Sequence, residues 1–471
     1  AANMPSAAGP APVAPVSPAP APAPQTPVAA ATAPSAPAAT TAPAAPAAPG
    51  ASPAPRLILQ VTVDQIRGDL PGRYRDRLGE GGFRYLMEKG TWYVNAHYQH
   101  ANTETAVGHA TLATGADPSR HGIVANDWID QKTGEFVYNT EDKRHHIIGR
   151  EAKAHEGVSP RNLLASAISD ELVVHNGGRT RAFSVSVKDR GAILPGGHVG
   201  KAFWFSKSTG EFVTSTYYYS DYPQWVKQWN AAKPADAYRN KSWKLLNDRA
   251  TYLHGQMDDR PYEADVKPLG RTFPHPLGGD TKYFYLLLTL TPIGDMLTFD
   301  FAKALVENEK LGQNDSGAPD YLQVSFSSTD YIGHLFGPSS LETEDNILRL
   351  DQTLADLFQF IDEKVGLDNT LIVLSADHGQ PEVPGYLQSM GQDKAAYFDP
   401  GALDKTAAVT ALRERFGLGG ELIEAFFQPY LYLDRDLIQS SLLGCPPTAF
   451  TGNQLVTVIF YSTYNDRLDY P

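Results

Sequence analysis

Residues 57–63 read LILQVTV and are followed directly by Asp64. A run of aliphatic and β-branched residues of this length is typical of a strand buried on both faces of a parallel sheet. Two further runs share the pattern, LQVSF at 322–326 and LIVL at 371–374, and each leads into acidic residues. We therefore expect three parallel strands with acids at their carboxyl ends, where ligands gather in sheets of this kind.

Segments with the helical spacing of apolar residues lie between and beside these runs. We expect helices at 82–89, 106–114, 160–174, 294–311 and 343–365. In the last of them the apolar positions include Ile347, Leu350, Leu354 and Ile361, which fall on one helix face. Strands that alternate with helices predict an α/β fold with a doubly wound, mostly parallel central sheet between layers of helices.

The composition excludes several classes of protein. The chain has 471 residues, with 40 Lys and Arg against 53 Asp and Glu, a net charge of -13 and no basic stretch. Because nucleic acids and anionic membranes need clustered positive charge, we expect neither as a partner. No apolar run approaches the roughly 18 residues that span a bilayer. The single cysteine, Cys445, permits neither an intramolecular disulfide nor a cysteine-based zinc module.

The first 55 residues differ in composition from the rest of the chain. They contain 16 of the 36 prolines and no charged residue. With a proline every few residues and no periodicity, the segment is predicted to be a disordered tether with a polyproline II bias. The chain starts at Ala1 and shows neither a basic n-region nor an apolar h-region. We therefore expect a mature form without its signal peptide, and a periplasmic or secreted protein.

Acids and histidines gather at the ends of the three predicted strands. Asp330 and His334 are four residues apart, so on a helical turn they face the same way and can bind one metal. Asp377 and His378 are adjacent and follow the third strand, as Asp64 follows the first. A single acid at a strand end is more often a helix cap or turn residue. The whole set, without thiolates, indicates zinc or another borderline divalent cation.

A candidate nucleophile precedes the helical pattern at 106–114. Thr105 is expected at the helix N-terminus, where free backbone N–H groups and the helix dipole favour an anion. Thr103 is a competing assignment, and an ordinary helix-capping threonine is the alternative interpretation. His109 lies four residues after Thr105 and is interpreted as a structural hydrogen-bonding residue.

Five segments occur in an order that points to one family. They are TVDQIRGD (62–69), NTETAVGHATLATGADPSRHGIVAND (102–127), VSVKDRGAI (185–193), SSTDYIGH (327–334) and SADHG (375–379). They resemble the alkaline phosphatase superfamily, and more narrowly the bacterial alkaline phosphatases with a threonine nucleophile, which are related to nucleotide pyrophosphatase/phosphodiesterases. The resemblance implies a core formed by 56–193 and 320–435, an inserted cap at 194–319, and an unrecognised segment at 436–471. We expect the aromatic residues of this cap to form a small core, and the alternative is that they line a substrate entrance.

The same resemblance implies two zinc ions and a set of site residues. Asp330 and His334 would bind the first zinc, and Asp64, Asp377, His378 and the Thr105 oxygen the second. Asn126, Lys188 and Arg190 match the family's contacts to phosphate oxygens. The implied reaction is hydrolysis of small-molecule phosphate monoesters by attack of Thr105, through a covalent phosphothreonine. We expect the protein to act as a monomer.

One feature departs from the family. The family supplies a third ligand of the first zinc from a His-Gly segment well downstream, whereas His378 is the last histidine of this sequence. Two other functions stay open, and the missing histidine supports only the second of them. One is a phosphodiesterase or nucleotide pyrophosphatase of the same superfamily, and the other is an inactive protein that binds zinc or phosphate without turnover.

Overall fold

The computed structural model describes residues 54–130, 132–153, 155–427 and 430–442. The tether expected at 1–55 lies almost entirely outside these ranges, as does most of the segment 436–471.

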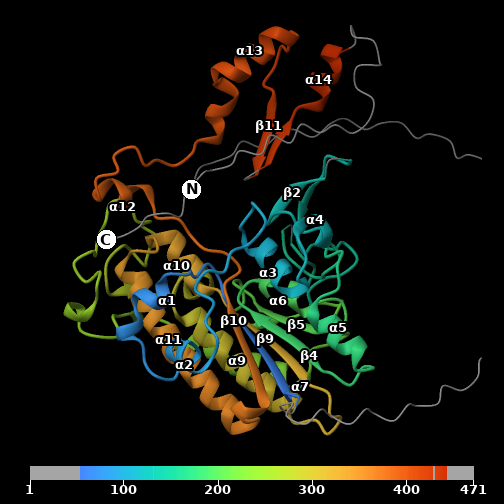
Figure 1. The fold of residues 1–471 in the computed structure, drawn as a ribbon, viewed down its shortest axis with the longest axis vertical. Coiled ribbons are helices and arrows are strands. Elements are labelled where there is room, and N and C mark those ends of the chain that lie inside the picture. Colours follow the sequence, from blue (N-terminus) through green and yellow to red (C-terminus); the bar gives the residue numbers. More distant parts are fainter. Residues whose placement is uncertain (1–53, 131, 154, 428–429, 443–471) are drawn as a thin grey trace, which may run out of the picture. The chain divides into compact units, whose positions relative to one another are not determined.

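The centre of the structure is a six-stranded sheet in the order β10-β1-β9-β4-β5-β6 (Figure 1). Its strands are β1 (Leu57–Val63), β4 (Ala182–Ser186), β5 (Lys201–Phe205), β6 (Phe212–Val213), β9 (Asp320–Phe326) and β10 (Thr370–Ser375). Neighbouring strands run parallel, except that β6 is antiparallel to β5. The expected mostly parallel sheet is confirmed, and the three predicted strands are β1, β9 and β10.

Helices cover the sheet and follow the predicted order. The main helices are α2 (Phe83–Lys89), α3 (Thr105–Thr114), α5 (Ile168–His175), α6 (Asp189–Gly196), α9 (Ile293–Glu309), α10 (Ser328–Phe336) and α11 (Leu341–Lys364). The helices expected at 82–89, 106–114, 294–311 and 343–365 are confirmed as α2, α3, α9 and α11. The helix expected at 160–174 is wrong in its first half. It begins only at Ile168, because the Asp170 carboxylate accepts a hydrogen bond from Ala167 N (2.9 Å) and caps the chain there.

Shorter elements complete the fold. They are α1 (Leu70–Arg73), α4 (Pro118–His121), α7 (Gln224–Ala232), α8 (Phe284–Thr289), α12 (Pro384–Ser389), α13 (Ala407–Phe416), α14 (Arg435–Leu442), and the two-stranded sheets β2 (Asp127–Ile129) with β3 (Phe136–Tyr138), β7 (Ser242–Trp243) with β8 (His275–Pro276), and β11 (Ile423–Phe427) with β12 (Tyr430–Leu433). The hairpin β11–β12 is separate from the central sheet. It touches the chain before and within β2, because Tyr430 Oη donates to Val124 O (3.2 Å) and Ile129 N donates to Tyr432 Oη (3.3 Å).

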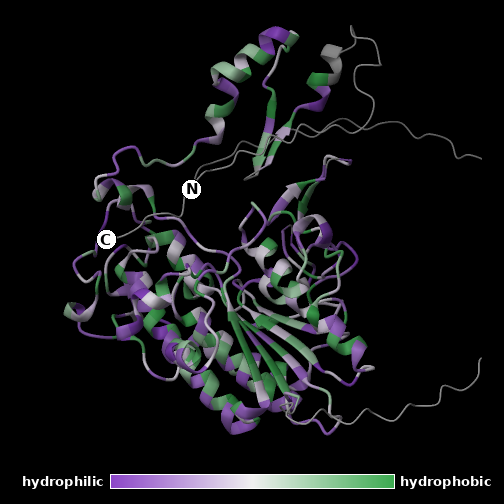
Figure 2. Ribbon diagram, viewed as in Figure 1, coloured by the Kyte–Doolittle hydropathy of each residue, from purple (hydrophilic) through white to green (hydrophobic). Residues whose placement is uncertain are grey.

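The two faces of the central sheet have different chemistry. One face is apolar and packs against α9 and α11 in the main core, where the strands contribute Leu57, Leu59, Val61, Val63, Phe183, Val185, Leu322, Val324 and Phe326. The hydrophobic character of the central strands is visible in Figure 2. The opposite face carries buried small polar residues, where Ser184 Oγ donates to Gln323 Oε1 (2.6 Å) and Gln323 Nε2 donates to Thr62 Oγ1 (3.3 Å). Helix α6 packs closely on this face, since a Cβ at Gly191 would lie 2.7 Å from Ser186 Oγ.

Part of the expected cap at 194–319 belongs to the central core. Strands β5 and β6 extend the sheet, and α9 packs against β9 and β4. The reason is hydrophobic burial: Phe203 and Phe212 are fully buried, and the Phe212 ring stacks on Phe301 with centroids 4.2 Å apart. The expected cap boundary is therefore wrong. The aromatic residues of this segment do not form one core: Trp204 and Trp243 are buried in separate hydrophobic clusters, and Trp225 and Trp229 pack against the main core.

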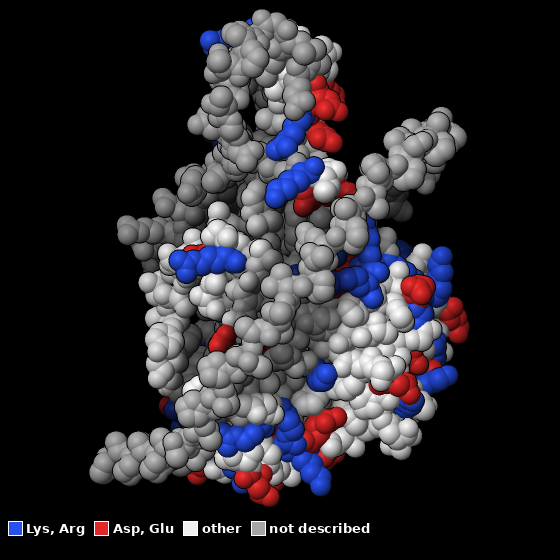
Figure 3. Space-filling view, turned by 90° about the vertical axis from the view of Figure 1, so that its right-hand side faces the viewer, with Lys and Arg blue, Asp and Glu red and all other residues white. Residues whose placement is uncertain are grey.

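The surface of the described part is of mixed polarity. On the face drawn in Figure 3, basic and acidic side chains are interspersed. No helix among the described residues has both the length and the apolar composition needed to cross a membrane. Strand β10 lies at the sheet edge, and its Leu371 and Val373 are exposed. The expectation that this run is buried on both faces is wrong, because Leu371 and Val373 project from the same face of the strand and that face is not covered.

Candidate active site

The candidate site lies at the carboxyl ends of β10, β1 and β9. Thr62 of β1 pairs with Ser375 of β10 on one side and with Ser325 of β9 on the other, so the three strands end at the same level. The chain then supplies one acid from each strand end: Asp64 after β1, Asp377 after β10, and Asp330 in the first turn of α10 after β9. All three are buried.

Asp64, Asp377 and His378 form a closed group. Their potential ligand atoms all lie within 4.8 Å of one another, and no other group of three metal-binding side chains occurs in the part of the chain that the structure describes. His378 Nε2 lies 3.6 Å from Asp64 Oδ1 and 3.8 Å from Asp377 Oδ2. These two carboxylate oxygens are buried and accept no hydrogen bond. Because a buried carboxylate oxygen without a hydrogen bond, such as Asp64 Oδ1, is costly, this donor set fits a divalent cation.

Asp330 and His334 form a second, more open pair. Asp330 Oδ1 lies 3.3 Å from His334 Nε2, as expected for residues one turn apart on α10. The His334 side chain is 66% exposed, and Gln65 Nε2 donates to its Nε2 (3.1 Å). Asp330 Oδ1 also lies 3.8 Å from His378 Nε2, which connects the pair to the closed group. Among the described residues, no third Asp, Glu, His or Cys forms a ligand group with this pair.

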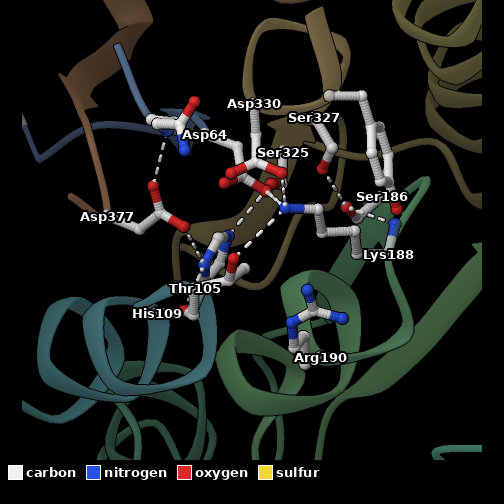
Figure 4. A network of polar contacts seen from close by, with 12 residues as sticks. Asp64, Thr105, His109, Ser186, Lys188, Arg190, Ser325, Ser327, Asp330 and Asp377 are labelled. Carbon is white, nitrogen blue, oxygen red and sulfur yellow. Dashed lines mark hydrogen bonds and ion pairs between the residues drawn. The ribbon is translucent and has the colours of Figure 1, made fainter. Parts of the chain in front are cut away.

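Thr105 lies at the start of α3 and faces both groups (Figure 4). It is buried, its Oγ1 lies 3.5 Å from His378 Nε2, and it accepts a hydrogen bond from Lys188 Nζ (3.2 Å). Thr103, the competing candidate, is exposed. The structure thus brings Thr105 to the acids and leaves Thr103 at the surface.

Lys188 is the buried cation of the site. Its Nζ donates to Asp330 Oδ2 (2.6 Å) and lies 2.8 Å from Asp64 Oδ2. Burial alone lowers the pKa of an ammonium, but the Asp330 and Asp64 carboxylates raise the pKa of Lys188 above its usual value. Lys188 is therefore charged and compensates two of the three acids.

The acids of the site respond differently to this environment. Burial, reinforced by the negative charge of Asp377, raises the pKa of Asp64 to about 7. Burial also acts to raise the pKa of Asp330, but the Lys188 ammonium and His334 hold it below its usual range. For Asp377, the nearby His378 and His109 outweigh burial and lower the pKa.

The predicted phosphate contacts lie around Thr105. Asn126 Oδ1 accepts a hydrogen bond from Ala106 N (2.9 Å), which ties Asn126 to the first turn of α3. In Figure 4 the Arg190 guanidinium extends from α6 toward Lys188 and Thr105. Its buried Nε makes no hydrogen bond, and one terminal nitrogen donates to Tyr138 Oη (3.4 Å). Every predicted site residue thus belongs to this region, with His334 at its exposed edge.

Three further residues support the site. His109 Nδ1 donates to Thr105 O (2.9 Å) and lies 3.0 Å from Asp377 Oδ2, which is the structural role expected for it. Gln65 and Gly108 were not predicted. Gln65 has a φ of 65° and its backbone N donates to Asp377 Oδ1 (2.9 Å). A Cβ at Gly108 would overlap the Asp377 carbonyl. A glycine inside a helix, between Thr105 and His109, was a signal that something packs closely there.

Comparison with known proteins agrees with this geometry. The family model for type I phosphodiesterase/nucleotide pyrophosphatase matches residues 58–423. A Myroides odoratus protein named calcium-transporting ATPase is 39% identical, covering 82% of this chain and 70% of that protein. Alkaline phosphatase PhoV of Synechococcus elongatus is 41% identical, covering 71% of this chain and 61% of that protein.

A crystal structure of alkaline phosphatase PafA is similar in fold as well as in sequence. It is 37% identical and superposes with a TM-score of 0.75, covering 83% of this chain and 74% of that one. The family model covers most of the described chain. The two alkaline phosphatases are similar in sequence to this chain over most of the length of this chain. The chain therefore belongs to the type I phosphodiesterase/nucleotide pyrophosphatase family within the alkaline phosphatase superfamily, and it is a phosphatase.

Proposed function

We propose that this chain hydrolyses phosphate monoesters through a covalent phosphothreonine at Thr105, with two zinc ions as cofactors. The position of Thr105 Oγ1 carries the proposal. It is buried at the start of α3 and lies within 3.5 Å of both Lys188 Nζ and His378 Nε2. A hydroxyl held beside a cation and a metal-binding group is suited to attack on phosphorus.

The metal ligands are assigned by their donor atoms. Asp64, Asp377 and His378, with Thr105 Oγ1, would hold one zinc, and Asp330 with His334 the other. Asp64 Oδ1, Asp330 Oδ1 and Asp377 Oδ2 are buried without hydrogen bonds, as expected of oxygens that bind cations. When bound, zinc lowers the pKa of a coordinated hydroxyl and stabilises negative charge that develops on oxygen. The Asp330–His334 pair supplies two of the three protein ligands typical of a catalytic zinc.

The side chains of the site act in two steps. In the first, a bond forms between Thr105 Oγ1 and phosphorus while the ester P–O bond breaks. The hydroxyl gives its proton to water and the departing alkoxide takes one from water, so this step neither consumes nor releases a net proton. In the second, water attacks phosphorus, the Oγ1–P bond breaks, and inorganic phosphate leaves as the hydroxyl is restored. Lys188, Arg190 and the N-terminus of α3 would stabilise the phosphoryl oxygens, and Asn126 Nδ2 would donate to one of them.

A related structure supports these assignments. One matching crystal structure is a PafA mutant altered at a threonine, an asparagine, a lysine and an arginine, with successive separations of 21, 62 and 2 positions. The same residue types at the same separations occur here as Thr105, Asn126, Lys188 and Arg190. The agreement in type and spacing supports a shared set of reacting and phosphate-binding residues.

A preference for monoesters follows from the charge of the site. The phosphoryl group of a monoester carries about two negative charges, and Lys188 and Arg190 provide two positive ones. The family's description favours a second candidate, a phosphodiesterase or nucleotide pyrophosphatase. The two-ligand pair Asp330 and His334 favours the third, a binding protein without turnover. The proposal also includes small-molecule substrates, a monomer, and a periplasmic or secreted location.

The test compares 4-nitrophenyl phosphate with bis(4-nitrophenyl) phosphate on the zinc-loaded chain. We expect kcat/KM to be higher for the monoester. Thr105→Ala should lower it at least about 1000-fold, while Thr105→Ser retains part of the activity because it keeps a hydroxyl. The double variant Lys188→Ala/Arg190→Ala should lose more activity on the monoester than on the diester.

Each other outcome has a distinct meaning. A preference for the diester would replace the proposal with the phosphodiesterase. Zinc binding without turnover of either ester would favour the binding protein. Full activity of Thr105→Ala would exclude Thr105 as the nucleophile.

A further inference from the structure

A cavity of about 650 Å³ adjoins the candidate active site. Its wall comes from the carboxyl ends of β4 and β5, from the chain before α5, and from the start of α8. Lys188 and Arg190 form part of this wall, so the cavity borders the position proposed for the phosphoryl group. Its volume is in the range of small-molecule binding sites, and it leaves room for a leaving group beyond the phosphate.

The wall of this cavity is positively charged. It contains five basic residues, Lys153, Lys188, Arg190, Lys207 and Lys282, against two acids, Glu156 and Asp189. Glu156 is already paired with Arg150, whose NH1 lies 2.7 Å from Glu156 Oε2. Asp189 accepts hydrogen bonds from Tyr138 Oη (2.7 Å) and Gly157 N (2.8 Å).

Three of the lysines form no ion pair within 4.0 Å in the described part of the chain, although one of them, Lys153, lies close enough to Glu156 to help lower the pKa of that carboxyl. They are Lys153, Lys207 and Lys282. Lys207 Nζ donates to the Tyr331 hydroxyl (2.6 Å), and Lys282 Nζ lies 4.9 Å from the centroid of the Tyr283 ring. Both of these partners are neutral. The positive charge around the cavity is therefore available to a ligand.

The spacing of the cations limits the size of that ligand. Lys188 Nζ lies 5.0 Å and Lys207 Nζ 4.7 Å from the centroid of the same Tyr331 ring. The two ammonium groups are therefore no more than about 10 Å apart, which a six-membered ring with a phosphate at each end can span. Tyr283 lines the same cavity, is 53% exposed and offers flat apolar surface to such a ring.

We propose that this cavity binds the leaving group of the substrate and selects phosphate monoesters that carry a second phosphate on a ring-sized skeleton. The inference rests on the proposed function, which places the first phosphate at Thr105. Lys153, Lys207 and Lys282 bind the second phosphate, which is not cleaved in the same turnover. The second phosphate is recognised by its charge and its acceptors. It is a doubly negative group with three acceptor oxygens, and it faces several ammonium groups that can donate to them.

The experiment uses two aryl esters that differ only at the far end of the ring. Phenyl phosphate is compared with 4-(phosphonomethyl)phenyl phosphate, whose second anion cannot be hydrolysed. The quantity measured on the zinc-loaded chain is the ratio of kcat/KM for the second ester to that for the first. We expect this ratio to fall about tenfold in the triple variant Lys153→Met/Lys207→Met/Lys282→Met, and the fall to shrink at high salt.

A matched triple variant controls for the change in net charge. Lys89, Lys244 and Lys405 are exposed and do not line the cavity. Replacing these three with Met should change the ratio less than about twofold. An equal fall of the ratio in both triple variants, or no fall in the cavity variant, would overturn the inference.

A binding measurement separates this inference from the proposed function. Calorimetry compares the affinity of the zinc-loaded chain for 1,4-phenylenebisphosphonate with that for phenylphosphonate, and needs no turnover. We expect the bisphosphonate to bind more tightly, and the cavity variant to lose this difference. If neither ester is hydrolysed but the difference in affinity is found, the proposed function fails and the anion site stands. If the esters are hydrolysed and the two affinities are equal, the anion site fails.

Discussion

The two groups of metal-binding side chains differ in burial and in completeness. Asp64, Asp377 and His378 are at most 6% exposed and come from the ends of the adjacent strands β1 and β10. Asp330 and His334 come from one turn of α10, and the His334 side chain is 66% exposed. Paired strands thus bring three ligands into one buried group, whereas one helical turn supplies two ligands and leaves one of them open to solvent.

Among the changes that test this contrast between the two groups, the largest effect is expected from one that removes no ligand. Gly108→Ala places a methyl group where the Asp377 carbonyl lies, so α3 and the loop after β10 have to move apart. Because displacements of about 1 Å can cost about 100-fold in rate, we expect kcat/KM for 4-nitrophenyl phosphate to fall about 100-fold. Circular dichroism and the melting temperature check that the variant is folded.

Gly68 is the matched control for this substitution. A Cβ at Gly68 meets no atom within 4 Å. Gly68→Ala should therefore keep activity within about twofold. Normal activity of a folded Gly108→Ala variant would show that the group of Asp64, Asp377 and His378 tolerates a displacement of α3 from the loop after β10. That result would weaken the contrast between this buried group and the open pair Asp330 and His334.

A smaller effect is expected at the open pair. His334→Ala leaves Asp330 alone, so we expect zinc affinity at this pair to fall at least about tenfold while one zinc stays bound. Activity at low zinc should fall and recover in part as zinc is raised. Zinc titration by calorimetry, together with activity at each concentration, measures both quantities.

His175 provides a control at an exposed helix position. It lies in the last turn of α5 and is exposed. His175→Ala should not change either titration. Loss of both zinc ions in His334→Ala would show that the two groups bind metal as one unit rather than as separate sites.

The smallest effect concerns pH. In the metal-free protein the pKa of Asp64 is raised to about 7, against 3.8 for the ordinary carboxyl. Protonated Asp64 therefore favours the folded state at low pH, and this contribution is lost as the pH rises toward and through 7. Below pH 7, zinc has to displace that proton. We expect the rise in melting temperature on adding zinc to be a few degrees larger at pH 8 than at pH 6.

Asp64→Asn tests the origin of this pH dependence. The variant cannot lose a proton at this position, so the difference between the two pH values should shrink. The pKa of Asp330 is held below its usual range, so its carboxylate contributes no such dependence near pH 7. A larger rise in melting temperature at pH 6 than at pH 8 would contradict the assignment of Asp64 as a zinc ligand.

The sequence was a good guide to the strands that carry the site. LILQVTV coincides with β1, because all of its residues except Gln60 are apolar or β-branched and the strand is paired on both sides. The sequence also predicted that the acids just beyond the three strand ends lie close together, since parallel strands bring their carboxyl ends to one edge of the sheet. Thr105 was a candidate because it precedes the helical pattern, with Thr103 left as an alternative, and the family resemblance implied its role as nucleophile. The structural role of His109 followed from its spacing of four residues from Thr105.

Other features depend on neighbours that are distant in sequence. LIVL is as apolar as the buried runs, but β10 lies at the edge and exposes Leu371 and Val373. Whether a strand is central or at an edge is set by what pairs with it, and β-propensity does not contain that information. KAFWF lies in the segment expected to form a cap, but it forms β5 and joins the central sheet. Its composition did not show which strands it would pair with. The left-handed backbone conformation of Gln65 could not be predicted, because this conformation is uncommon in residues other than glycine and no local sequence signal marks it here.

The level ending of β10, β1 and β9 limits which changes in length the protein can accept. Moving β10 by one residue relative to β1 would shift Asp377 by about 3.3 Å and turn its side chain to the opposite face of the sheet. An insertion or deletion within these strands would thus remove a ligand without changing any residue of the site. Loops that leave the opposite ends of the strands carry no such restriction. Differences in length among related proteins should therefore concentrate at the amino ends of these strands.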